Sequence, residues 1–121
     1  MYMDLIKILK ALKLIKKHKL KDANVVLYGS NPYHCGDNIT LYLKIENGII
    51  KDASFEGTGC NILMYATSKF IEHIKGKNVK EILELSDREF LKEIDLADIS
   101  KSRLQCALLP LKTFKEKLPR I

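Results

Sequence analysis

The stretch "NITLYLKIENGIIKDASFEG", residues 38–57, decides the fold of this chain because it contains two strand patterns joined by a tight turn. In its first half, apolar residues alternate with more polar ones, which is the period of a strand with one buried face. The dipeptide Asn47-Gly48 follows, and it favours a two-residue type I′ hairpin turn. The alternating apolar residues are Ile39, Leu41, Leu43 and Ile45. We therefore predict an antiparallel hairpin of strands 38–46 and 49–57.

The segments around the hairpin complete an α+β pattern. The short β-branched stretch "NVVLYG" (24–29) predicts an edge strand. Apolar residues at helical spacing predict helices over 60–74, 79–85 and 87–93, and Gly76 ends the first of them. We predict one α+β domain over the whole chain, with a small antiparallel sheet of about three strands packed against several helices.

A final helix is expected near the C-terminus, where apolar residues share one side from Leu104 to Leu118. Pro110 interrupts this pattern, because its ring would clash with the carbonyl group of Cys106, four positions back. Either the helix begins near Leu109 or it bends at Cys106. Both alternatives predict irregular backbone at this third cysteine.

The composition is typical of a soluble globular domain. The chain has 121 residues, of which 46% are apolar and 30% are charged, and this length suits one core. No apolar run approaches the roughly 18 residues of a membrane span, and lysines interrupt the apolar N-terminal stretches, so no signal peptide is expected. Three cysteines argue against a secreted disulfide framework and favour a reducing cytoplasm.

The net charge of +6 belongs to residues 1–21, which hold seven lysines and one acidic residue. This segment is predicted to form a basic amphipathic helix. Such a helix can bind an acidic protein, a polyanion or a membrane surface, whereas a solvated lysine face on a helix packed against its own domain is the ordinary explanation. Because the rest of the chain has 14 basic and 14 acidic residues, we expect no nucleic acid and no membrane as partners.

The hairpin register brings two cysteines to the open end of the sheet. If Asn38 lies opposite Gly57, the extended ladder places Cys35 opposite Cys60, and a bulge would make this pairing approximate. In "GTGC", Cys60 opens a helix, where free N–H groups favour a thiolate.

Two further potential ligands, Asp37 and Cys106, are expected at the same place. Gly36 permits unusual backbone angles, so the flanking Cys35 and Asp37 can turn toward one point. Cys106 lies at the start of the expected final helix, a second position from which a ligand can be presented. Three thiolates and one carboxylate are potential ligands for a tetrahedral ion or a small cluster.

Ordinary structural roles remain open for these residues. Cys106 could be a small buried hydrophobic residue, and Cys35 and Cys60 could form a disulfide. Asp37 could cap the turn before the strand. The default interpretations of the two nearby histidine positions are a loop residue for His34 and a surface residue for His73.

Four motifs occur in a set order: "NPYHCGD" (31–37), "FEGTGC" (55–60), "GK" (76–77) and "RLQCALLP" (103–110). Together they resemble the U-type iron–sulfur cluster assembly scaffold family, which comprises IscU, SufU and the N-terminal domain of NifU. The order and spacing of all three cysteines fit. The resemblance covers about residues 24–118.

The resemblance implies an IscU/SufU-like fold with a ligand site at one tip of the sheet. It implies Cys35, Cys60 and Cys106 as ligands of iron in a transient [2Fe-2S] cluster, or of zinc. It also implies that Asp37 completes the set in zinc-bound forms and makes a bound cluster labile. Members of the family receive sulfur as persulfide from a cysteine desulfurase and pass the cluster to apo iron–sulfur proteins. Which cysteine accepts sulfur is left open, and a monomer or weak dimer is expected.

Two positions depart from parts of this family. Gln105 stands where the IscU branch has a histidine, just before the third cysteine. Arg103, three residues before Cys106, resembles the SufU pattern, in which a basic residue can stabilise a thiolate. The longer insert that the SufU branch usually carries between the second and third cysteines is missing here.

The leading hypothesis is therefore a non-enzymatic scaffold. The alternative is a zinc-dependent sulfur acceptor, a SufU-type sulfurtransferase that relays persulfide without storing a cluster. A structural zinc module whose basic helix binds nucleic acid is a third hypothesis.

Overall fold

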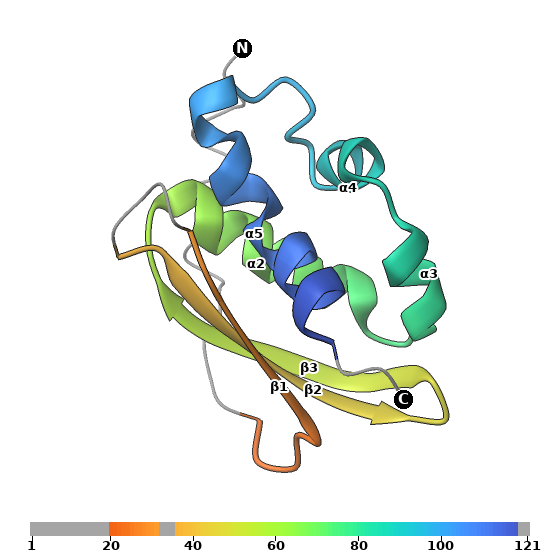
Figure 1. Ribbon diagram of the computed structural model, residues 1–121. Coiled ribbons are helices and arrows are strands. Elements are labelled where there is room, and N and C mark those ends of the chain that lie inside the picture. The colour runs from red at the N-terminus through yellow and green to blue at the C-terminus, as the bar shows by residue number, and fades with distance from the viewer. Residues whose placement is uncertain (1–19, 32–35, 119–121) are drawn as a thin grey trace.

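The computed structural model describes residues 20–31 and 36–118. Its sheet has three antiparallel strands in the order β1-β2-β3 (Figure 1). They are β1 Val25–Ser30, β2 Asn38–Glu46 and β3 Ile49–Thr58. The predicted hairpin and edge strand are thus confirmed, with strand bounds that agree within one residue.

The hairpin turn has the geometry that its sequence predicts. Asn47 has φ 53° and Gly48 has φ 77°, and a type I′ turn requires positive φ at both central residues. Asn tolerates this region better than most side chains, and Gly has no Cβ to clash. The turn therefore starts the ladder with Glu46 opposite Ile49.

A β-bulge then corrects the predicted register. Ile45 lies opposite Ile50, but Lys44 lies opposite Asp52, so one residue of β3 has no partner. From there Asn38 lies opposite Thr58 and not opposite Gly57. The predicted pairing of Asn38 with Gly57 was therefore wrong by one position, because β3 contains a bulge of the kind that the sequence-based prediction allowed for. The expected pairing of cysteines 35 and 60 stays a prediction, since residues 32–35 lie outside the described residues.

The physical reason for the bulge is the burial of β3 against the helices. Ile50, Ala53 and Phe55 are all buried, although a regular strand would place Ile50 and Phe55 on opposite faces. One extra residue between them returns both side chains to the same side of the sheet.

Four helices follow the sheet, and the predicted helices are confirmed. They are α2 Asn61–Ile74, α3 Val79–Glu84, α4 Asp87–Glu93 and α5 Lys101–Lys117. The long helices α2 and α5 pack against each other, with α2 on β3 and α5 on β1 and β2. Figure 1 shows the helices gathered over one face of the sheet. The resulting α+β architecture is the predicted fold class.

Helix α5 starts earlier than one of the two sequence-based alternatives predicted. It begins at Lys101 and continues across Pro110, so the alternative of a start near Leu109 was wrong. Cys106 lies in the second turn and is helical, so the expected irregular backbone at this residue was wrong as well. Only one main-chain hydrogen bond is lost to the proline, and burial of most residues from Cys106 to Phe114 stabilises the helix in compensation.

The docking of α5 on β1 depends on close approach. A Cβ atom at Gly29 would lie only 1.9 Å from the Oγ1 atom of Thr113, so only glycine allows the helix to lie this near the strand. Gly29 therefore lets α5, the helix that carries Cys106, lie close against β1.

The predicted basic helix at the N-terminus falls mostly outside the described residues and stays a prediction. No helix among residues 20–31 and 36–118 has the length and apolar character needed to cross a membrane.

Candidate metal centre

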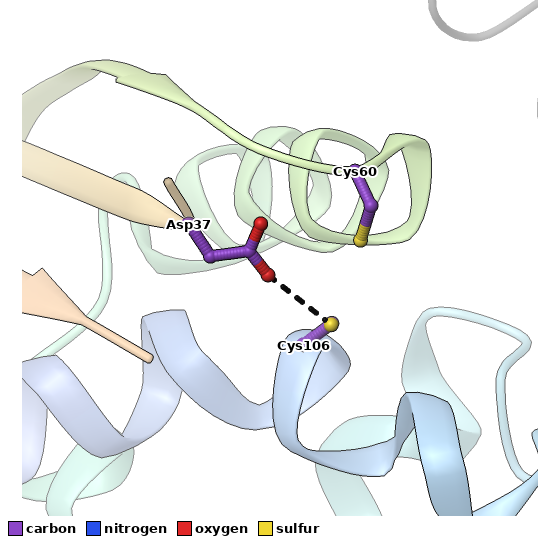
Figure 2. Close-up of side chains that lie close together, drawn as sticks. All are labelled: Asp37, Cys60 and Cys106. Carbon is purple, nitrogen blue, oxygen red and sulfur yellow. Dashed lines mark hydrogen bonds between the residues drawn. The ribbon is translucent and has the colours of Figure 1, made fainter. Parts of the chain in front are cut away.

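Three predicted site residues converge at the open end of the sheet. Asp37 immediately precedes β2, Cys60 is the N-cap residue of α2, and Cys106 comes from α5. One potential ligand atom from each residue lies within 4.8 Å of the other two. Figure 2 shows the carboxylate and both sulfur atoms turned toward one another.

The cluster is polar and mostly buried, with Cys60 partly exposed. Asp37 is 7% exposed and Cys106 is 1% exposed. The Sγ atom of Cys106 donates to Oδ2 of Asp37 over 3.4 Å. Among the described residues, no lysine or arginine forms an ion pair with Asp37. A buried carboxylate beside two thiols, with no positive side chain from residues 20–31 or 36–118 to balance it, fits a metal cation.

Burial of the Cys106 thiol, together with its neighbours Cys60 and Asp37, raises its pKa to about 12. A negative group beside a thiol disfavours the thiolate, as desolvation does. At neutral pH the thiol is therefore protonated. A metal ion that binds this sulfur has to displace a proton.

Local backbone geometry brings Asp37 and Cys60 together. Thr58 donates from its hydroxyl group to the carbonyl of Gly36 over 2.9 Å, which ties the loop before β2 to the end of β3. Gly36 has φ 91°, as expected from its predicted unusual backbone angles.

Gly59 makes room for the carboxylate of Asp37. It has φ 154°, and an added Cβ would lie 2.8 Å from Oδ1 of Asp37 and 2.6 Å from Cδ2 of Leu63. Glycine is thus required here both for the backbone angle and for the space. The residue after it, Cys60, makes no side-chain cap hydrogen bond.

The other sequence-based candidates are placed less decisively. Cys60 and Cys106 are free thiols, so the alternative of a disulfide at Cys60 is wrong. Arg103 is exposed one turn before Cys106, and it forms no ion pair with a described carboxylate. Cys35 and its neighbour His34 lie outside the described residues.

His73 is less exposed than the predicted surface position implies. The side chain is half-buried on α2, and desolvation lowers its pKa, with a further contribution from Lys77. His73 is not a member of the Asp37, Cys60 and Cys106 cluster.

Asn31 is a contact of this cluster that the sequence did not reveal. Its side chain donates from Nδ2 to Sγ of Cys106 over 3.8 Å, and it is only 6% exposed. The available signal was its place at the start of "NPYHCGD", the motif that also holds Asp37. An asparagine before a proline is common in turns, so the sequence offered no reason to expect a contact between Asn31 and Cys106.

Residues 13–118 match the family described as the NifU-like N terminal domain. This chain belongs to that family. The match covers most of the chain and includes every residue of the cluster, so the resemblance seen in the motifs is confirmed.

Named relatives of this NifU-like protein come from both branches. The chain is 42% identical to the iron–sulfur cluster assembly scaffold protein IscU of Thermotoga maritima, over 85% of this chain and 82% of the relative. It is 34% identical to the zinc-dependent sulfurtransferase SufU of Bacillus subtilis, over 77% and 74% of the two chains.

Solved structures agree with the fold. A protein of Fervidobacterium islandicum AW-1, described as a candidate iron–sulfur scaffold of the SUF system, superposes with a TM-score of 0.79 at 30% identity, covering 98% of this chain and 96% of the other. A NifU-like N-terminal structure from Brucella abortus superposes with a TM-score of 0.75 at 18% identity, covering 92% and 88%, and supports the fold alone.

Proposed function

We propose that this NifU-like protein is an iron–sulfur cluster assembly scaffold. In this proposal it receives sulfur from a cysteine desulfurase, assembles a labile [2Fe-2S] cluster on Cys35, Cys60 and Cys106, and passes it to apo-proteins. The observation that carries the proposal is the convergence of Asp37, Cys60 and Cys106 from three separate elements within 4.8 Å. The 42% identity to a named IscU scaffold supports it.

The donor set suits a cargo that is held and then released. Thiolate sulfur is a soft ligand that binds iron and zinc strongly, whereas a carboxylate oxygen is harder and exchanges more readily. Cys60 and Cys106 would supply firm bonds, with Cys35 as the third sulfur, and Asp37 would supply the weak one. Since Asp37 is buried beside Cys106, the weak ligand is already close to the place where it would bind.

Anaerobic reconstitution with iron and sulfide tests this function. The wild-type protein should develop the charge-transfer absorption of a cluster, and Cys60→Ser should lose it because one thiolate ligand is gone. Thr58→Ser is the matched control, since it changes the same turn but keeps the hydroxyl group that donates to Gly36. A wild-type product that stays colourless and holds no iron would remove the scaffold function.

A zinc-dependent sulfur acceptor is the second candidate function, favoured by the 34% identity to SufU and by Arg103 near the third cysteine. The same ligands would hold zinc and relay persulfide without storing a cluster. This function predicts tight zinc, strong stimulation of a cysteine desulfurase and no transfer of a cluster to an apo-protein. Transfer of an intact cluster would decide for the scaffold.

Several further expectations belong to this proposal. We infer one domain over residues 1–121, a cytoplasmic location and a monomer or weak dimer. The named partners are a cysteine desulfurase and apo iron–sulfur proteins, with no nucleic acid and no membrane. A mobility shift with excess nucleic acid at low salt, where phosphate contacts are strongest, would contradict the expectation that nucleic acid is no partner.

A further inference from the structure

Asn31 contacts two of the clustered residues through different groups. Its main-chain N–H donates to the carbonyl oxygen of Asp37 over 3.1 Å. Its side-chain Nδ2 donates to Sγ of Cys106 over 3.8 Å. One buried residue, directly after β1, therefore spans the Asp37 loop and helix α5, which are separated by 69 positions at Asp37 and Cys106.

The two hydrogen bonds at the Cys106 sulfur respond differently to a bound metal ion. The thiol proton that Cys106 now donates to Asp37 leaves when the sulfur becomes a ligand, because the ligand form is the thiolate. The amide of Asn31 donates and needs no proton from the sulfur. A donor facing a charged acceptor makes a stronger hydrogen bond than a donor facing a neutral one.

A hydrogen bond to a ligating sulfur changes the metal bond as well as the orientation of the side chain. It withdraws electron density from the thiolate, and hydrogen bonds of this kind are among the features that set the potentials of iron–sulfur clusters. Groups that contact a ligand typically change metal affinity by about 10- to 100-fold when they are removed.

We propose that Asn31 is a positioning residue of the metal centre, which orients the Cys106 sulfur and stabilises its thiolate toward a bound cation through the amide Nδ2. This inference rests on the proposed function only in so far as Cys106 is a ligand. It holds for iron, zinc or a cluster, because the contact is to the sulfur and not to the cargo.

Cobalt(II), a spectroscopic probe for tetrahedral thiolate sites, tests the role of Asn31 without any activity assay. Asn31→Leu keeps the size of the side chain and removes the amide, while the main-chain bond to Asp37 remains. We expect cobalt affinity to fall about 10- to 100-fold. We also expect the sulfur-to-cobalt charge-transfer band to move to longer wavelength, since the sulfur regains electron density. Asn31→Gln retains a donor and should restore part of the band position.

Asn24→Leu is the matched control at the other end of the sheet. Asn24 donates from Nδ2 to the carbonyl of Ile45 and accepts from the N–H of Ile45, so its loss removes comparable amide hydrogen bonds far from the cluster. This variant should lose stability but keep the cobalt band of the wild type. Thermal unfolding of the metal-free proteins shows whether each variant folds.

The outcomes separate this inference from the proposed function. A wild-type protein that binds no cobalt through its thiols overturns both. A wild type that binds cobalt, with Asn31→Leu matching it in affinity and band position, overturns the role of Asn31 alone. If the Asn31→Leu protein is unfolded, Asn31→Gln decides. The role of Asn31 then requires the charge-transfer band of Asn31→Gln to lie at a longer wavelength than that of the wild type, and an unchanged band overturns it.

Discussion

At the turn end of the sheet, charged side chains lie in solvent and find partners of opposite sign. The Nζ atom of Lys44 lies 2.7 Å from Oδ2 of Asp22. The Nζ atom of Lys75 lies 3.8 Å from Oδ1 of Asp52. These groups are each about a third exposed or more. Exposed pairs of this kind contribute little to stability because water and salt screen them.

At the open end of the same sheet, Asp37 and Cys106 are buried, and no cationic side chain in the described part of the chain forms an ion pair with Asp37. Asp37 and Cys106 hydrogen-bond to each other, and the amide of Asn31 completes the contact. Burial of a polar cluster costs free energy unless partners satisfy it. The contrast teaches that the turn end is built for folding, whereas the open end keeps groups that folding alone does not require.

The largest expected effect is a loss of metal on acidification. The pKa of Cys106 is about 12, so its thiol is protonated between pH 6 and pH 8 and each bound metal ion must displace that proton. We expect cobalt affinity to fall at least about 100-fold from pH 8 to pH 6, which is tenfold per pH unit for one proton. Titrations monitored by the charge-transfer band measure this fall.

The stability of the metal-free protein should behave differently over the same pH range. A raised pKa in the folded state stabilises the protein below the ordinary thiol value of 9.0, and this stabilisation is lost only as the pH rises toward about 12. The Cys106 contribution is thus constant from pH 6 to pH 8. Cobalt affinity that does not change with pH would show that Cys106 is no ligand.

A pair of glycine substitutions compares the two ends directly. Gly48→Ala and Gly59→Ala both place a Cβ at positive φ, and each should cost about 1–3 kcal/mol of stability. Only Gly59→Ala should also weaken cobalt binding, because its Cβ would overlap the Asp37 carboxylate. Denaturant unfolding and cobalt titration of both variants measure the difference. Equal loss of metal affinity in the two would contradict the comparison.

Removal of the carboxylate should lengthen the life of a bound cluster. Asp37→Ala leaves the thiolates as the firm ligands and removes the ligand that exchanges most easily. We expect a several-fold slower decay of the cluster absorption in the presence of a chelator. Asp52→Ala, the removal of an exposed carboxylate at the turn end, is the control and should leave the decay unchanged. An equally labile cluster in Asp37→Ala would mean that this residue is not the point of exchange.

The smallest effect is expected from the turn-end charges. Lys75→Ala removes the ion pair with Asp52 and should change stability by less than about 1 kcal/mol, with the difference shrinking further at high salt. Its cobalt affinity should equal that of the wild type. A large loss of metal from this variant would show that the two ends are coupled.

The hairpin could be predicted because its signals are local. Alternating apolar residues and the Asn47-Gly48 turn specify two strands without reference to the rest of the chain. The bulge also had a local signal, since Ile50 and Phe55 are five positions apart yet both apolar. That spacing is incompatible with one face of a regular strand, and it would have predicted the register shift.

The course of α5 could not be read from local rules. A proline inside a helical pattern favours a break, but long-range burial against α2 and β1 outweighs the lost hydrogen bond. The contact of Asn31 with Cys106 spans 75 positions and depends entirely on how α5 docks. No property of either residue in isolation predicts this contact.

The sequence by itself determined the strands, the short helices and the residue types of the metal centre, because backbone propensities and ligand chemistry act over a few neighbouring positions. Tertiary structure alone decided how closely the carboxylate of Asp37 and the sulfurs of Cys60 and Cys106 approach one another, and how deeply Asp37 and Cys106 are buried. Packing of α5 on the sheet, close at Gly29, sets those distances. They arise from contacts between segments remote along the chain, which local patterns do not encode.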